Sequence, residues 1–310
     1  MRKSLLFVLL FCSVVNAQTT SPTKGEVPGV ALHTRELLWT KMNQEILRTE
    51  QGFDGVLGVV VRDLTDGREI AINADEVFPT ASCIKLALLT ELYRQSQTGS
   101  GARLTDTYIL DERDLVPDSY VMQNLTPNVS RVTNRDLATF VVAVSDNAAT
   151  NLLIDRVGME NVNRMLNSAD LHETRLRRKM MDAEAAKAGR ENVSTAREMA
   201  LLMEDIYRAR ILDRQSSDDL LRLLSTPKDS WIPRLLPDVK IANKPGALDG
   251  VRNDVGIVLL KNHPYVICVF STYAHDEHAA ENVISQISLL AYKYFSQVEN
   301  ASAYGRTLAP

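Results

Sequence analysis

Strand-like patterns occur in two parts of this chain of 310 residues, and these parts lie far apart in the sequence. Apolar, β-branched runs at 55–61 and 69–72 flank the turn Asp66-Gly67, and similar runs at 255–260 and 265–272 flank Asn262-His263-Pro264. Each pair of runs is typical of an antiparallel hairpin. Because both ends of the chain have this pattern, we expect them to form one α/β unit.

The middle of the chain, from residue 82 to about 224, shows helical periodicity instead. There, apolar residues recur at helical spacing over 84–93, 134–144, 148–157, 162–166, 195–207 and 217–224. The same spacing occurs near the two ends of the chain, over 34–49 and 281–294. The sequence therefore predicts an α/β part over about 30–80 and 225–298 that is interrupted by an all-helical insertion over about 81–224.

Charge and composition narrow the kind of partner. The chain has 35 Lys and Arg against 39 Asp and Glu, a formal net charge of −4, and 45% hydrophobic residues. These values are those of an ordinary globular protein, with no excess of basic residues to neutralise phosphates. Nucleic acid and anionic lipid are therefore not expected as partners. We expect a small-molecule substrate and a monomer.

The first seventeen residues have the pattern of a secretory signal peptide. Arg2 and Lys3 precede an apolar run over 5–15, which ends in Val15-Asn16-Ala17. This run is too short to span a bilayer. We expect cleavage before Gln18, a mature chain over 18–310 with no membrane segment, and a secreted or periplasmic location.

Disulfides are not the organising principle of the expected mature chain. Only Cys83 and Cys268 remain after removal of the leader, and both lie in apolar patterns that are typical of a core. A hydrophobic core must therefore stabilise the fold. Whether the two cysteines pair stays open at this point.

The pattern Ser-x-x-Lys occurs three times, beginning at Ser21, Ser82 and Ser225. In a helix the lysine lies one turn beyond the serine on the same face, where it can take the hydroxyl proton. Only Ser82-Cys-Ile-Lys85 opens a helix, because Ser21 lies in the polar tail and a proline precedes Lys228. Ser82 is therefore a candidate nucleophile and Lys85 its base. A plain helix cap and a solvated surface lysine are the alternatives.

Two further motifs follow at junctions between elements. Ser145-Asp146-Asn147 comes after an apolar helical face and offers a second hydroxyl and an amide, although it also suits a loop with a helix cap. Asn243-Lys244-Pro245-Gly246-Ala247 precedes the third strand-like run. Its lysine beside a glycine fits a cation at a strand edge that a ligand backbone can approach, or an edge lysine that prevents aggregation.

The order S-x-x-K, S-D-N, K-x-G resembles that of the penicillin-recognising serine hydrolases, and within them the class A β-lactamases. The resemblance covers roughly residues 32–295 at the level of element order. It implies an α+β fold: a five-stranded antiparallel sheet with flanking terminal helices, an inserted all-helical domain, and a cleft between the two.

The resemblance also implies roles for the motif residues. Ser82 would be the acylated nucleophile and Lys85 its proton acceptor. Ser145 would pass the proton to the leaving nitrogen, while Lys244 tunes Ser145 and attracts the substrate carboxylate. No metal or other cofactor is needed, and His33, His172, His263, His275 and His278 lack the spacing of a metal-binding motif.

Other residues would bind the substrate. Asn147 would hold the substrate side-chain amide, Gly246 would allow close approach, and the N–H groups of Ser82 and Ala247 would form an oxyanion hole. Arg252 is a weaker candidate for a second carboxylate anchor. Tyr120 is a weaker candidate for a wall of the cleft.

The sequence departs from the family pattern in two places. Pro245 replaces the usual threonine of K-T-G, which removes a hydroxyl that would contact the substrate carboxylate. The loop that would carry a deacylating glutamate, with an asparagine four residues later, has Lys179 at the position found by counting without gaps. Its acids are Asp182 and Glu184, and neither is followed by that asparagine.

Three functions therefore stay open. The first and favoured one is a serine hydrolase that forms an acyl-enzyme at Ser82 and hydrolyses β-lactams. The second is a D,D-peptidase that acts on peptidoglycan stem peptides. The third is a penicillin-binding sensor that is acylated without turnover.

Overall fold

The computed structural model describes residues 30–302 and 304–307. Its centre is a five-stranded antiparallel sheet in the order β2-β1-β9-β8-β7. The strands are β1 (Val56–Asp63), β2 (Glu69–Ile72), β7 (Ile241–Leu248), β8 (Val251–Val258) and β9 (Tyr265–Thr272). The two expected hairpins form, and they join where β1 pairs with β9 along its whole length. The α+β fold with a five-stranded antiparallel sheet is confirmed.

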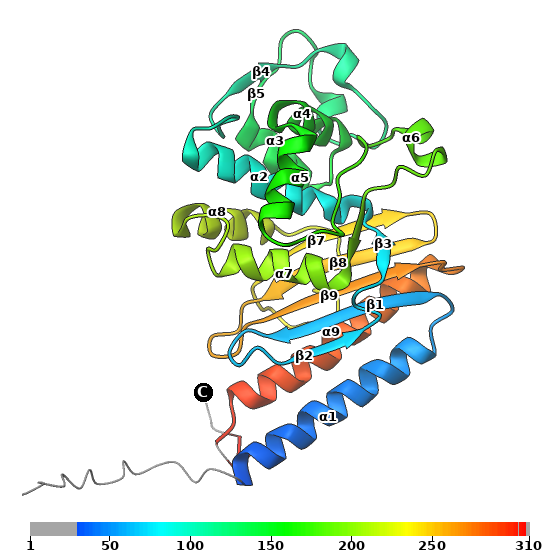
Figure 1. Cartoon of the computed structure of the whole chain (residues 1–310), viewed down its shortest axis with the longest axis vertical. Helices are drawn as coiled ribbons and strands as arrows, with labels where there is room; N and C mark the ends of the chain where they lie inside the picture. Colours follow the sequence, from blue (N-terminus) through cyan, green and yellow to red (C-terminus); the bar gives the residue numbers. More distant parts are fainter. Residues whose placement is uncertain (1–29, 303, 308–310) are drawn as a thin grey trace, which may run out of the picture.

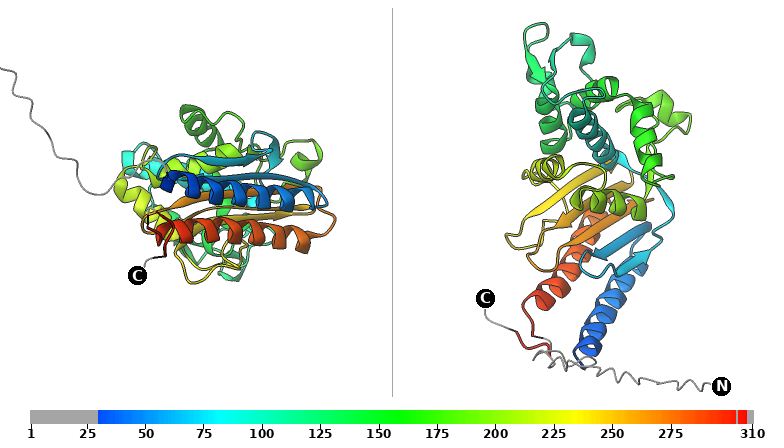
Figure 2. Two further views of the ribbon diagram at one scale, coloured as in Figure 1. Left: turned by 90° about the horizontal axis from the view of Figure 1, so that it is seen from below. Right: turned by 60° about the vertical axis from the view of Figure 1, so that its left-hand side comes forward.

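Two long terminal helices lie side by side against one face of the sheet (Figures 1 and 2). These are α1 (Val30–Gln51) and α9 (Glu277–Glu299). The opposite face packs against α7 (Ala196–Tyr207). Strand β9 shows how the sheet divides the core, because Ile267 and Val269 face the terminal helices whereas Cys268 and Phe270 face the helical part. This alternation is the period of two expected of a strand buried on both faces.

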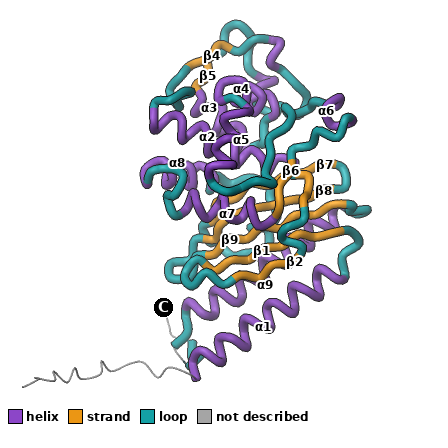
Figure 3. The backbone as a smooth tube through the Cα atoms, viewed as in Figure 1, coloured by secondary structure: helices purple, strands orange, loops and turns teal. Residues whose placement is uncertain are grey.

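A group of helices lies above the sheet in Figure 1, and Figure 3 shows the strands and helices as separate layers. Its members are α2 (Lys85–Thr98), α3 (Asn134–Ala143), α4 (Asn147–Val157), α5 (Met159–Ser168), α6 (Ala183–Lys187) and α8 (Arg214–Leu224). The helical periodicity located five of these within a few residues. It did not find the short α6, which has five residues and one buried side chain.

The sequence reading also missed two small sheets. Strand β3 (Val77–Pro79) pairs with β6 (Val193–Thr195), and β4 (Thr107–Ile109) pairs with β5 (Arg131–Thr133). Each strand has three residues, which is too few to show an alternating pattern. Short 3-10 helices also occur: η1 (Ala81–Ile84), η2 (Glu112–Asp114) and η3 (Met122–Asn124).

The expected leader, residues 1–17, lies outside the described residues, and the domain boundaries derived from the sequence stay a prediction. Within the described part of the chain, no helix is long and apolar enough to cross a membrane. Cys83 and Cys268 are both buried and both free, so they do not pair.

Candidate active site

Ser82 lies in the tight turn η1, which packs against strands β7 and β8 and leads directly into α2. The preceding Ala81 has a φ of 48°, a left-handed conformation that is costly for a residue with a Cβ. The turn is held in place by Thr80, whose N–H and hydroxyl both donate to the carbonyl oxygen of Asn192, at 2.9 and 3.0 Å. The chain therefore fixes Ser82 through strained backbone that its surroundings stabilise.

Lys85, the first residue of α2, is fully buried. Its Nζ lies 2.6 Å from the carbonyl oxygen of Ser145, 3.0 Å from the Ser145 hydroxyl and 3.0 Å from Oδ1 of Asn147. No carboxylate forms an ion pair with it among the residues that the structure describes. Burial, together with the nearby Lys244, holds the pKa of Lys85 well below its usual value.

Ser145 brings the two lysines together. Its hydroxyl accepts hydrogen bonds from Lys244 at 3.1 Å and from Lys85 at 3.0 Å, and its φ of 57° is again left-handed. Asp146, the next residue, is buried and caps α4 by accepting from the N–H of Ala149. The central residue of S-D-N is therefore structural, and it fixes the direction of its two neighbours.

Lys244 lies on β7, the edge strand of the sheet, and is fully buried. Its Nζ donates to the hydroxyl of Ser145 and, at 2.8 Å, to the carbonyl oxygen of Pro245. Burial lowers its pKa to about 8, while the charge of Asp254 acts in the opposite direction. Near neutral pH, Lys244 therefore keeps most of its charge, whereas Lys85 is the better proton acceptor.

Gly246 is the point at which β7 touches η1. A Cβ at this position would lie 2.7 Å from the backbone N of Ser82 and 2.9 Å from the N of Cys83. Only glycine allows this contact without movement of the backbone. The close approach brings β7, and with it Ala247, beside the nucleophilic turn.

A cavity of about 410 Å³ opens over these residues. Its lining includes Ser82, Asn147 and Ala247 from the motifs, together with Met180 and Asp182 from the loop before α6. The structure thus places the nucleophile, the amide and the strand edge around one space. Lys85, Ser145 and Lys244 lie beneath them, and the roles of all these residues stay proposals.

One of the loop residues held against this cavity is a methionine. Met180 is 8% exposed, and its backbone N–H and carbonyl oxygen both bond to the side chain of Asn151, at 2.8 and 3.1 Å. Asp182 lines the cavity but is exposed, and its Oδ1 caps α6 at the N–H of Ala185. Glu184 pairs instead with Lys187 on the exposed side of α6. Of the two candidate acids, only Asp182 lines the cavity with Ser82.

Comparison with known proteins identifies the family. A model of the beta-lactamase enzyme family matches residues 40–295. The chain belongs to the beta-lactamase enzyme family. Beta-lactamase ROB-1 of Haemophilus influenzae is 29% identical in an alignment of 296 residues that covers 90% of this chain and 91% of that protein.

Solved structures of this family show the same fold. An ancestral class A β-lactamase superposes with a TM-score of 0.76 at 26% identity, covering 82% of this chain and all of the other. A PBP-A variant, solved as an acyl-enzyme complex with penicillin G, gives 0.75 at 27% identity and covers 83% of this chain and 97% of that one. The class A-like assignment from the three motifs is confirmed.

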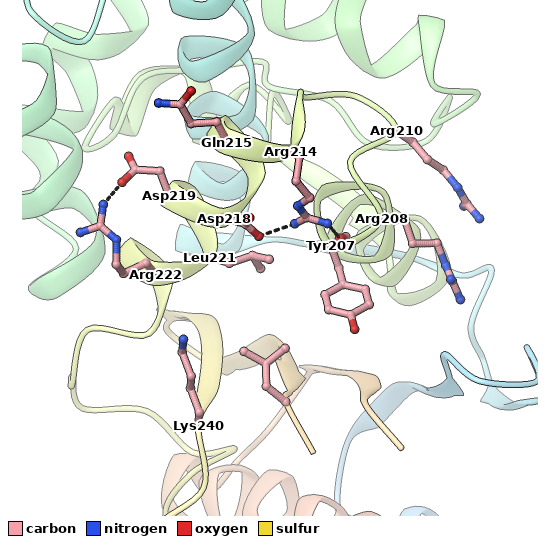
Figure 4. A pocket seen from close by; sticks show the side chains of 11 residues that line it. Tyr207, Arg208, Arg210, Arg214, Gln215, Asp218, Asp219, Leu221, Arg222 and Lys240 are labelled. Atoms are coloured by element: carbon pink, nitrogen blue, oxygen red, sulfur yellow. Dashed lines mark hydrogen bonds and ion pairs between the residues drawn. The ribbon is translucent and has the colours of Figure 1, made fainter. Parts of the chain in front are cut away.

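A second cavity, of about 1220 Å³, lies between the end of α7, α8, the start of β7 and the end of β8, and is lined by residues that include Arg214, Arg222 and Lys240 (Figure 4). Arg214 pairs with Asp218 and Arg222 with Asp219. None of the motif residues lines this cavity, so it is separate from the candidate active site.

Arg252 and Tyr120, the two weaker candidates from the sequence, do not line the cavity that Ser82 lines. The guanidinium of Arg252 pairs with Glu277 and Glu281 of α9, and the residue is not part of the lining of the Ser82 cavity. Tyr120 is 58% exposed and does not line it either. Neither Arg252 nor Tyr120 therefore lies at the Ser82 cavity.

Two asparagines that position the site were missed by the sequence reading. Asn192 connects the loop before α6 to the segment that precedes Ser82. Its Oδ1 accepts hydrogen bonds from the N–H groups of Arg177 and Arg178, and its carbonyl oxygen accepts one from the hydroxyl of Thr80. Asn151 clasps Met180 as described above. Asn151 is a polar residue in a mostly apolar pattern, which does not identify its partner, whereas Asn192 stands among polar and charged residues that give no such signal.

Proposed function

We propose that this protein is a class A-like serine β-lactamase in which Ser82 attacks the carbonyl carbon of the β-lactam ring and the resulting ester is then hydrolysed. One observation carries the proposal: a single serine hydroxyl, that of Ser145, lies within hydrogen-bond distance of two buried lysines, beside a cavity lined by Ser82. Family membership supports the same substrate class.

Lys85 can reach its neutral, basic form because its pKa is low. Its Nζ donates to three oxygens, those of the Ser145 carbonyl, the Ser145 hydroxyl and the Asn147 amide, and burial beside Lys244 holds its pKa well below the usual value. Loss of one proton frees a lone pair that can accept the proton of Ser82. Because none of these contacts is with Ser82, we propose that Lys85 turns to the Ser82 hydroxyl when substrate binds.

The remaining groups complete the acylation. As the Ser82 oxygen bonds to the lactam carbon, its proton passes to Lys85, and the N–H groups of Ser82 and Ala247 stabilise the oxyanion. The C–N bond then breaks, and the nitrogen takes the proton of Ser145, which Lys85 restores. The ammonium of Lys244 lowers the cost of the charge that develops on Ser145 and binds the substrate carboxylate.

Hydrolysis of the ester needs a base that holds a water molecule. We propose Asp182, whose second carboxylate oxygen has no partner among the described residues while its Oδ1 caps α6. Water adds to the ester carbonyl as its proton passes to Asp182, and the proton then returns to the Ser82 oxygen as the C–O bond breaks. No metal or other cofactor is part of this proposal.

A second candidate function has a specific observation in its favour. The loop residue clasped by Asn151 against the cavity is the apolar Met180, which cannot activate water. A D,D-peptidase or a penicillin-binding sensor needs Ser82 and Lys85 for acylation but not a fast base for β-lactam ester hydrolysis. The likeness to PBP-A, which was solved as a penicillin G acyl-enzyme, fits this alternative.

We further propose that residues 1–17 are a cleaved leader, that the mature chain acts outside the cytoplasm as a monomer, and that residues of about 81–224 form the helical insertion. The sequence pattern supports the first of these. The arrangement of helices above the sheet supports the last.

The test compares two substrates on the same preparation. A chromogenic cephalosporin reports β-lactam turnover, and a peptide that ends in D-alanyl-D-alanine reports release of D-alanine. The proposal expects continuous cephalosporin turnover that is lost in Ser82→Ala and kept in Ser225→Ala, the serine of another S-x-x-K motif. Release of D-alanine, with a single stoichiometric burst on the cephalosporin, would instead establish the peptidase.

A further inference from the structure

The third Ser-x-x-Lys motif has no part in the proposed acylation, yet its lysine lies close to the site. Lys228 follows α8 and is only partly exposed, and its ammonium donates to the carbonyl oxygen of Leu224 at 2.7 Å and to Oδ1 of Asn243 at 3.3 Å. Asn243 is the residue before Lys244 on β7. Successive residues of a strand point to opposite faces, so Lys228 lies on the side of β7 that faces away from Ser145.

Asp254 of β8 completes this arrangement. It is fully buried and accepts two hydrogen bonds from the amide of Asn243, at 2.9 and 3.1 Å. It also accepts hydrogen bonds from the N–H groups of Trp231 and Ile232, both at 3.0 Å. Burial raises the pKa of Asp254, whereas the hydrogen bonds from Ile232, Asn243 and Trp231 and the charge of Lys228 act to lower it. All four contacts are with donors, so they favour the ionised carboxylate.

The amide of Asn243 therefore joins a cation to an anion. Its oxygen faces Lys228 and its nitrogen faces Asp254. Gly256 leaves room for this side chain, because a Cβ there would lie 2.7 Å from the Cβ of Asn243. The three side chains form one connected chain behind the strand that carries Lys244.

We infer that Lys228, Asn243 and Asp254 form a positioning unit that sets how much positive charge Lys244 carries in the cleft. The inference rests on the proposed acylation of Ser82. Lys244 has no ion pair with a carboxylate among the described residues, so the charge of Asp254, across the strand, is its compensation. Lys228 opposes this effect, because it is a second cation bound to the same carboxylate through Asn243.

The pKa directions agree with this arrangement. Burial lowers the pKa of Lys228 to about 8, where Asp254 acts to raise it and Lys244 to lower it. Burial also lowers the pKa of Lys244 to about 8, again with Asp254 acting to raise it. The two lysines therefore titrate in the same pH range, the charge of Asp254 acts on both, and Lys244 lowers the pKa of Lys228.

The other charged or titratable groups near Lys244 are few. Lys85 of α2 and Cys83 of η1 face it from the cleft side, and Asp146 acts on Lys85. Helix α8 also packs on β7, but its acids are engaged elsewhere, Asp218 with Arg214 and Asp219 with Arg135 and Arg222. None of these groups changes in a Lys228 variant.

The test measures the rate at which a fluorescent penicillin labels Ser82 between about pH 6 and 10. Acylation needs Lys244 charged, so the wild-type rate should fall as the pH rises through about 8. Lys228→Met removes the competing cation, and the midpoint of this fall should move upward by about one pH unit, the size of effect that one charge exerts across a strand at an effective dielectric of about 20. At pH 9 the labelling rate of the variant, as a fraction of its own maximum rate, should then be about five times the same fraction for wild type.

Matched variants separate charge from packing. Lys228→Arg keeps the cation and should leave the midpoint unchanged, and Lys240→Met, an exposed lysine just before β7, should do the same. Asp254→Asn should move the midpoint downward. If Asp254→Asn does not fold, the two Lys228 variants decide the question alone.

The outcomes are distinct. A midpoint that moves in Lys228→Met but not in Lys228→Arg supports the inference. Coincident profiles for wild type and Lys228→Met, even with a lower melting temperature, would overturn it and leave Lys228 with a structural role. If wild type is not labelled at all at Ser82, the proposed function itself fails.

Discussion

The contact between Gly246 and the turn η1 gives a sharp prediction for Gly246→Ala. The new Cβ would lie 2.7 Å from the N of Ser82, 2.9 Å from the N of Cys83 and 2.9 Å from the carbonyl oxygen of Thr80. Ordinary contact begins at about 3.4 Å. All three neighbours are backbone atoms, so no side chain can rotate away. Strand β7 and η1 must separate by several tenths of an ångström.

This displacement should affect activity more than stability. Overpacking of this kind costs about 1–3 kcal/mol of unfolding free energy. The separation also moves the N–H groups of Ser82 and Ala247 apart, and loss of one oxyanion donor costs about 10²–10³ in rate. We therefore expect Gly246→Ala to label with fluorescent penicillin about a hundredfold more slowly, while its melting temperature falls by only a few degrees.

Gly52→Ala is the matched control. Gly52 lies just after α1, and a Cβ there would meet only backbone oxygens at 3.5 and 3.9 Å. Its labelling rate should equal that of wild type. Labelling of Gly246→Ala within a few-fold of wild type, in a folded protein, would refute the argument that this contact sets the oxyanion hole.

Three further predictions concern single side chains. Lys85→Arg keeps the positive charge but cannot act as a base near neutral pH, so acylation should slow by at least about a hundredfold, measured by stopped-flow labelling. Asp182→Asn should leave acylation intact and let the acyl-enzyme accumulate in intact-protein mass spectra, whereas Glu184→Gln, on the exposed side of α6, should not. Asn192→Ala removes the bonds from Arg177 and Arg178, and chemical denaturation should show about 1–3 kcal/mol less stability.

Much of the fold was predictable because it rests on long, periodic patterns. Strand β9 (Tyr265–Thr272) was located to the residue, since seven of its eight residues are apolar or β-branched and they follow a turn that contains Pro264. The S-x-x-K and S-D-N motifs lie at element junctions, where local sequence determines local structure, whereas K-x-G lies within strand β7 rather than at the expected junction before a strand. Lys85, Ser145 and Lys244 do come together, as the resemblance implied.

What could not be predicted depends on contacts between segments distant in sequence. The direction of the Arg252 side chain depends on its ion pairs with Glu277 and Glu281, which lie on α9, about 25 to 29 residues later in the sequence. The loop from Leu176 to Gly189 has no periodicity, and its place was set by Asn151 and Asn192 from outside it. Counting along the sequence put Lys179 at the family's glutamate position, but Lys179 pairs with Asp155 and does not line the cavity.

The most direct test of the central claim is intact-protein and peptide mass spectrometry during turnover of a penicillin. We expect a transient mass increase equal to that of the whole penicillin, located on the peptide that contains Ser82, which disappears when substrate is exhausted. Ser82→Ala should show neither the increase nor turnover. An adduct on another residue, or turnover that survives in Ser82→Ala, would contradict the account.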